Sequence, residues 1–296
     1  MTEERAHKAT EKRLAKIEQR LAGIYDRAGK ELEAKADKYF SQFAEADEKK
    51  LKLVEQGKLD EEQYTAWRKR QMLTGERYTR LKEQIATEYA NINQTALSYI
   101  NDELPEVYAL NYNALEDKVD GVGGYSFELT DADTVRNLAL NDETLLPTKD
   151  LDIPKDMAWS TKKMNAELLQ GILQGEKITD IAKRLETVTG MEKVAALRNA
   201  RTMFTAAQNK GRLDSYARAT ADGIILQKEW LSADQTGRTR DWHMSDSFNE
   251  LIVDVDKPFH NGKGDIMYPG DPTAHPANVY NCRCTMVAVV KGFKKV

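Results

Sequence analysis

Cysteine and histidine are both scarce in this sequence, and their positions are uneven. The 296 residues include two cysteines and four histidines. Both cysteines, Cys282 and Cys284, lie in the stretch NVYNCRCTM, and three histidines precede them in the last quarter of the chain: His243, His260 and His275. Two cysteines do not make a disulfide framework. Their clustering with histidines points instead to a shared site.

Long apolar runs and an excess of positive charge are also missing. No stretch approaches the roughly 20 apolar residues of a membrane-spanning helix, and the charged sequence MTEERAHKATEKRLAK lacks the apolar segment of a secretory signal. We therefore expect no membrane association, and a protein made and used in a cytoplasm or packaged from one. The net charge of −4 argues against non-specific coating of nucleic acid, which rests on many Lys and Arg contacts. A local basic patch stays open.

Charged residues, at 31% of the chain, alternate with apolar residues at helical spacing in the N-terminal third. Apolar positions recur in steps of three and four from Leu14 to Phe43 and again from Tyr78 to Tyr99. The pattern breaks at Gly57. Residues 1–104 are thus predicted to form a long amphipathic helical hairpin, which packs within its own protein or offers a docking or self-association surface.

Pro105 is predicted to end this hairpin, and residues 105–158 to form a loop-rich connector with one short helix near Val135 to Leu140. Residues 159–296 are predicted to form the third domain. Its first helix starts at a cap on Ser160 or Thr161, and a second short helix runs from Thr179 to Gly190. Such a pair is also compatible with a DNA-reading helix-turn-helix.

A long helix is predicted from Met191 to about Ala221, ended by Gly223. The β-branched or apolar stretches IILQKEWLSA, LIVDVD and MVAVV then predict a small sheet. The fold class is therefore α+β and mostly helical, with a small C-terminal domain that contains β-strands.

The pair Cys282 and Cys284 favours a metal site. In an extended segment, residues two apart point to the same face, so both sulfurs face the same way. With histidine nearby they suit tetrahedral zinc, although ordinary burial of two small apolar side chains is the rival interpretation. The predicted ligands of a structural zinc ion are His243, His275, Cys282 and Cys284, with His260 in reserve.

Other polar residues surround these histidines. The segments DQTGRTRDWH and YPGDP contribute Asp234, Arg238, Arg240 and Asp271. Asp with His and Arg is able to support acid–base chemistry, but Asp–Arg pairs and rigid turns more often stabilise loops. No established hydrolase, phosphate-loop or metalloprotease motif is present, and we predict no catalytic residue.

An ordered series of motifs in the last third is similar to a known family. The series comprises Arg201–Thr202, Asn209, Gly211, Trp230, Asp234, Arg240, His243, Pro258–Phe259, PGDP at 269–272 and NCRC at 281–284. It resembles the Mu F-like head morphogenesis domain of phage minor head proteins, over roughly residues 160 to 290. One departure is local: Ser245 to Asn249 stand where a glycine-bearing turn would be expected after the histidine.

The resemblance implies a structural protein of the virion. Such proteins are present in few copies, are linked to the portal vertex and enter the procapsid in the host cytoplasm; some are thought to associate with DNA. It also implies that His243, Cys282 and Cys284 are the signature set. Expected partners are therefore portal, major capsid or scaffold proteins. Two alternatives stay open: a DNA-binding module for packaging or ejection, and a zinc-dependent hydrolase or transferase using Asp234, Arg240 and His243.

Overall fold

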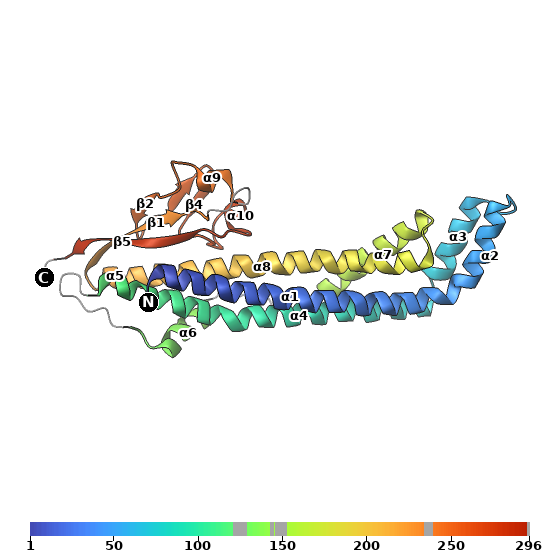
Figure 1. Cartoon of the computed structure of the whole chain (residues 1–296), viewed down its shortest axis with the longest axis horizontal. Coiled ribbons are helices and arrows are strands. Elements are labelled where there is room, and N and C mark those ends of the chain that lie inside the picture. The colour runs from blue at the N-terminus through green and yellow to red at the C-terminus, as the bar shows by residue number, and fades with distance from the viewer. Residues whose placement is uncertain (121–128, 143–144, 146–152, 234–238, 295–296) are drawn as a thin grey trace. The chain divides into compact units, whose positions relative to one another are not determined.

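The computed structural model describes residues 1–120, 129–142, 145, 153–233 and 239–294. Contacts divide the chain into two compact units. Unit 1 combines Met1–Gln19, Ser98–Thr148 and Leu197–Val296, and unit 2 combines Arg20–Leu97 and Lys149–Ala196. The α+β class is confirmed, with long helices followed by a small C-terminal antiparallel sheet (Figure 1). The three consecutive domain ranges remain a sequence prediction.

Four helices, not two, make up the N-terminal region. The order is α1 (Glu3–Phe40), α2 (Ala44–Glu55), α3 (Glu61–Met72) and α4 (Glu76–Tyr112), with a short 3₁₀ turn at Ser41–Phe43. Gly57 lies in the turn between α2 and α3 with φ +67°. The prediction that a single turn at Gly57 joins two long helices was therefore wrong, because the shorter helices α2 and α3 lie between α1 and α4 in the sequence.

Helices α1 and α4 are antiparallel in both units. In unit 2 the Tyr25 hydroxyl donates to Asn93 at 2.7 Å, and Lys35 pairs with Glu88. In unit 1 Arg13 pairs with Glu103 at 2.6 Å. The apolar stripe predicted from Leu14 onward is buried, so it packs within the chain.

Pro105 does not end the hairpin. It lies inside α4, which continues to Tyr112. A proline within a helix costs about 3 kcal/mol, yet its neighbours Leu104, Val107 and Tyr108 are fully packed. Burial of these three side chains offsets that cost, because each contributes on the order of 1.5–3 kcal/mol.

The helices in the second half of the chain are longer than predicted from the positions of its glycines. Helix α6 (Ala132–Leu140) confirms the short helix in the connector. Helix α7 (Ile153–Leu173) begins before the expected caps, and α8 (Ile178–Ala221) runs through Gly190 without a break. The predicted end of the second helix at Gly190 was therefore wrong, since the segment from Thr179 belongs to the start of a 44-residue helix, and this removes the pair of short helices that was compatible with a DNA-reading helix-turn-helix.

Unit 2 is held together by one apolar cluster. It joins side chains of α1, α4, α7 and α8, including Leu32, Tyr89, Leu168 and Leu185. The Tyr89 hydroxyl also contacts the Leu185 carbonyl and the Thr189 hydroxyl. Tertiary burial of this kind explains why the helix passes Gly190, whose propensity cost is only about 1 kcal/mol.

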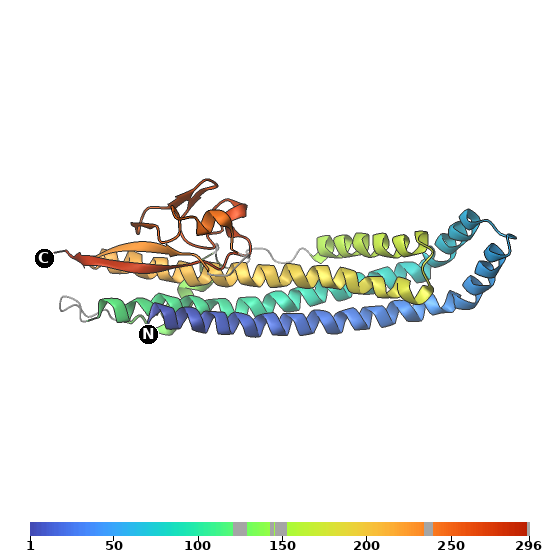
Figure 2. The ribbon, with the colours of Figure 1, turned by 45° about the horizontal axis from the view of Figure 1, so that its top comes forward.

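Unit 1 contains the sheet. Strand β1 (Ile224–Leu231) pairs antiparallel with β2 (Ile252–Asp254) on one side and with β5 (Thr285–Phe293) on the other. Strands β3 (Phe259–Asn261) and β4 (Gly264–Ile266) form a separate hairpin. The three predicted strands are confirmed, and Gly223, with φ +97°, ends α8 as expected. Figure 1 and Figure 2 both show β5 lying along the C-terminal part of α8.

Short elements complete unit 1. These are a 3₁₀ turn at Asn113–Leu115, α5 (Glu116–Val119), α9 (Asp241–Met244) and α10 (Pro276–Val279). An apolar cluster around Trp230 connects the sheet with α8 and α5, and it includes both cysteines. None of the helices in the described ranges is long and apolar enough to cross a membrane.

Candidate functional site

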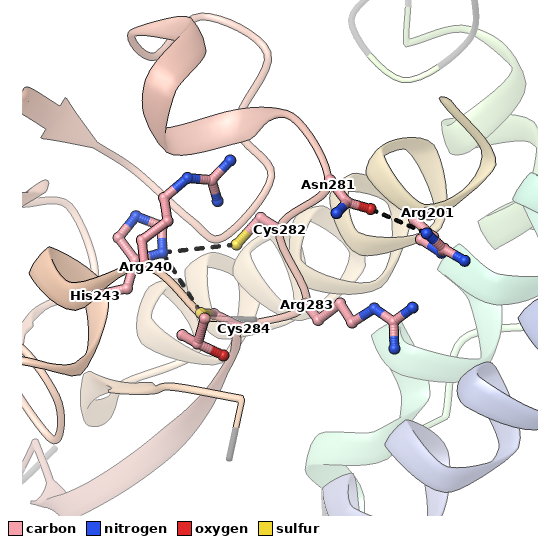
Figure 3. Close-up of a pocket in the computed structure, with 8 residues that line it drawn as sticks. Arg201, Arg240, His243, Asn281, Cys282, Arg283 and Cys284 are labelled. Atoms are coloured by element: carbon pink, nitrogen blue, oxygen red, sulfur yellow. Dashed lines mark hydrogen bonds between the residues drawn. The ribbon is translucent and has the colours of Figure 1, made fainter. Parts of the chain in front are cut away.

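Three of the predicted ligand residues meet in unit 1. His243 lies on α9, and Cys282 and Cys284 lie in the irregular segment directly before β5. The His243 Nδ1 atom is 3.9 Å from the Cys282 sulfur and 3.6 Å from the Cys284 sulfur, and all three donor atoms lie within 4.8 Å of one another. Figure 3 shows both sulfurs directed at the imidazole. This buried cluster of one nitrogen and two sulfurs is able to hold a metal ion.

The two cysteines point to the same side although they precede the strand. Asn281 takes φ +59°, and residues 282–284 then lead into β5, which begins at Thr285. Side chains two apart in extended chain share a face, which is the reasoning that predicted the pair. Arg283, between them, points away from the imidazole (Figure 3).

A hydrogen-bond network fixes the orientation and the tautomer of His243. Asn278 Oδ1 lies 3.0 Å from the Trp242 indole nitrogen, 3.2 Å from His243 Nε2 and 3.2 Å from Asn261 Nδ2. An indole N–H only donates, so the Asn278 atom that it meets must be the amide oxygen. His243 Nε2 therefore carries a hydrogen and donates it to Asn278. In the neutral ring this leaves the Nδ1 lone pair facing the two thiols, as a metal ligand requires.

The two thiols affect each other's ionisation. A hydrogen bond from the Cys282 thiol lowers the pKa of Cys284 to about 5, against the effect of burial. The same pairing, together with burial, raises the pKa of Cys282 well above its ordinary value. Cys284 is therefore the first of the two to lose its proton. Binding of a metal would release the second proton.

Aromatic packing supports the imidazole. The Trp230 ring meets it edge-on at 5.1 Å, and Phe248 stacks on it at 5.8 Å between centroids. Phe248 belongs to the segment where the motif departs from the family pattern. There the backbone turns without glycine, because Glu250 adopts φ +62° and its N–H is bonded to the Trp230 carbonyl.

One face of α8 positions the cysteine segment. Thr205 donates to the Cys282 carbonyl at 2.7 Å, and the Asn209 amide donates to the carbonyls of Pro269 and Cys284 while accepting from the Met286 N–H. Gly270 takes φ +85° where the PGDP loop passes the α8 backbone at Ala206. Asn209 and Gly270 are therefore motif positions for a physical reason: they hold the cysteine segment and the PGDP loop against α8.

The remaining predicted residues lie elsewhere. His275 is exposed, and its Nδ1 accepts from the Ala277 N–H at the start of α10. The structure does not bring it into the cluster. His260 is also exposed, and its Nδ1 lies 2.7 Å from Asp265. Asp271 is buried and organises its own loop by accepting from Met267 and Thr273. Asp234 and Arg238 lie outside the described residues.

Sequence reasoning missed Asn278 and the surroundings of the cluster. Asn278 was visible only as a polar residue between His275 and Cys282, and no motif rule marks it. A cavity of about 400 Å³ adjoins the cluster and is lined by Arg201, Thr239, Arg240, His243, Asn281, Cys282, Arg283 and Cys284. The three arginines are far apart in sequence, so only the fold brings them to one cavity.

Comparison with known proteins matches this part of the chain. The family described as phage Mu protein F-like matches residues 162–287, which contain α8, β1 and all three cluster residues. The minor head protein GP7 of Bacillus phage SPP1 is 26% identical over 229 residues, covering 73% of this chain and 70% of that protein. No solved structure matches significantly. The ordered motifs, the helix and sheet that carry them and these two matches agree: residues 162–287 are similar to the Mu F-like family, and the chain as a whole is similar to a phage minor head protein.

Proposed function

We propose that this chain is a structural minor head protein that associates with the portal vertex and enters the procapsid during assembly in the host cytoplasm. The observation that carries the proposal is the extent of the similarity to the SPP1 minor head protein. It covers 73% of the chain, whereas the family match spans residues 162–287. The relationship therefore extends into the helical part as well as the C-terminal part.

The helices supply the surface for assembly partners. The apolar stripes of α1 and α4 are buried within the chain, so they are not free for another protein. Their outward faces are charged, which suits a specific but polar interface with portal, capsid or scaffold proteins. Contact with packaged DNA and self-association through the N-terminal helices remain predictions of the sequence.

The Cys–His cluster is proposed to bind a structural zinc ion. Zinc binds sulfur at about 2.3 Å and nitrogen at about 2.0–2.1 Å. In a tetrahedron these lengths put sulfur about 3.6 Å from nitrogen. The separations here are 3.6 and 3.9 Å, so the nitrogen–sulfur distances need to change by only a few tenths of an ångström to accept an ion. The metal would connect α9 to the start of β5, two segments that share no strand pairing.

The role is proposed to be structural and not catalytic. A zinc hydrolase or transferase would need a zinc-bound water and a positioned acid–base group. The assignment rests on the family, whose characterised relative carries the name of a head protein. It predicts incorporation into heads without turnover.

The assembly role is tested by isolating procapsids from cells that produce this phage, with and without the gene for this chain. We expect the chain in procapsids and virions at a few copies, and co-elution of the full-length chain with the portal protein encoded in the same genome. A protein missing from both particles would refute the proposal. Capsid shells formed without portal serve as the control, since they should contain little of the chain.

The metal is tested by measuring zinc per chain after purification without added metal. We expect about one zinc per chain, lost in Cys282→Ser and His243→Ala but retained in the control His275→Ala. Loss in His275→Ala would restore the four-ligand sequence prediction. A metal-free wild type that stays metal-free after incubation with zinc would rule out the site.

A further inference from the structure

The cavity beside the cluster is rich in positive charge. Three of the residues that line it are arginines, and none of its described lining residues is acidic. The three cluster residues themselves form part of its wall. Figure 3 shows the Arg240 side chain beside the imidazole of His243, whereas the side chains of Arg201 and Arg283 lie on the other side of the cysteine pair.

The arginines are not equally committed to other partners. Arg201 forms an ion pair with Glu18, and its Nη1 lies 3.4 Å from Asn281 Oδ1. Arg240 donates from Nη2 to the Tyr280 carbonyl, and no ion pair involves it among the described residues. A carbonyl satisfies one of the five guanidinium N–H groups and neutralises no charge. Arg240 is thus the best placed to bind an anion.

Among the residues that the structure describes, the cluster has three donor atoms and no fourth. Zinc is four-coordinate in structural sites, but the described chain gathers only His243, Cys282 and Cys284 within ligand distance. Two thiolates neutralise the charge of a zinc ion, so the filled cluster would not repel an incoming anion. The surrounding arginines would attract one.

We infer that a phosphate group binds in this cavity, with one oxygen as the fourth metal ligand and another held by the guanidinium group of Arg240. This inference rests on the metal site proposed above. Phosphate is favoured because guanidinium groups pair with it through two parallel N–H donors. The cavity volume of about 400 Å³ also admits a phosphate ester, so inorganic phosphate and the phosphate of a larger molecule share this chemistry.

The test replaces zinc with Co²⁺ in the full-length protein, because the visible absorption of cobalt reports its fourth ligand. Cobalt per chain is measured first, and inorganic phosphate is then titrated. We expect a saturable spectral change in the wild type. Arg240→Gln should need at least about tenfold more phosphate for the same change, because it loses one charge-assisted contact. Arg198→Gln is the matched control, since Arg198 is an exposed arginine of α8 that does not line the cavity.

Phenyl phosphate and diethyl phosphate distinguish the source of the phosphate. Competition by the first supports a terminal phosphate, and competition by the second supports an internal phosphodiester. If cobalt binds but phosphate does not change its spectrum, this inference is overturned and the metal site is not. The same holds if Arg240→Gln responds to phosphate as the wild type does. A spectrum that changes in Asp234→Asn without phosphate overturns it too, because a protein carboxylate would then be the fourth ligand. A chain that takes up no cobalt refutes both this inference and the metal site.

Discussion

At Gly211 the backbones of α4 and α8 approach each other closely in unit 1. An alanine Cβ built there would lie 2.5 Å from the Tyr108 carbonyl oxygen and 3.3 Å from the Tyr112 nitrogen. Both atoms are backbone, so no side-chain rotation relieves the contact. Gly190, on the same helix, has nothing within 4 Å of the equivalent Cβ. The same substitution at the two positions should therefore change stability in opposite directions.

The magnitudes follow from two competing terms. Replacing a helical glycine with alanine stabilises by up to about 1 kcal/mol. Overpacking typically costs about 1–3 kcal/mol, and a contact roughly 1 Å inside the optimum of about 3.5 Å belongs at the upper end. We expect Gly211→Ala to lower the free energy of unfolding by about 2 kcal/mol and Gly190→Ala to raise it by up to about 1 kcal/mol.

The assay is thermal and urea unfolding followed by far-UV circular dichroism, with metal content held equal among the three proteins. The expected shifts are a Tm lower by roughly 4–8 °C for Gly211→Ala and higher by roughly 2–4 °C for Gly190→Ala. A Gly211→Ala protein as stable as the wild type would show that α4 and α8 do not approach as described. Destabilisation of equal size at both positions would show that helix geometry and not the interhelical contact is responsible.

Three further predictions concern residues of unit 1 in the C-terminal part of the chain. Gly270→Ala should lower the free energy of unfolding by more than about 2 kcal/mol, because φ is +85° and its Cβ would lie 2.7 Å from the Ala206 nitrogen; an unchanged melting curve would contradict this. Asn278→Ala should weaken metal binding about 10–100-fold, measured in competition with a chelator, because His243 loses the hydrogen-bond acceptor that fixes its tautomer. Asn261→Ala is the control and should have a smaller effect, because it leaves that acceptor in place. Burial lowers the pKa of Lys228 to about 8 from an ordinary 10.5, so between these pH values the folded state binds fewer protons than the unfolded state. The free energy of unfolding, measured relative to Lys228→Met, should therefore rise by about 3 kcal/mol as the pH increases from 8 to 10.5. Parallel pH profiles of stability for the two proteins would refute this assignment.

Local sequence signals predicted the strands and several helix segments because each rests on neighbouring residues. The apolar–polar spacing from Leu14 onward gave one amphipathic face, and the β-branched stretches after Gly223 gave the three strands of the sheet. The boundaries failed where tertiary packing outweighed a local breaker. Pro105 and Gly190 each disfavour a helix, but burial of their neighbours offsets a few kcal/mol.

The sequence by itself determined the residue types of the Cys–His cluster. Two thiols two residues apart in extended chain must share a face, and three histidines nearby supplied the candidate nitrogen ligands. Only the tertiary structure decided which histidine joins them: His243 is buried against Trp230 and bonded to Asn278, while His275 and His260 are exposed. It also brought Arg201, Arg240 and Arg283 to one cavity. Distances between residues far apart in the chain depend on how α8 and the loops pack, and that packing is a sum of many small contacts that no local pattern encodes.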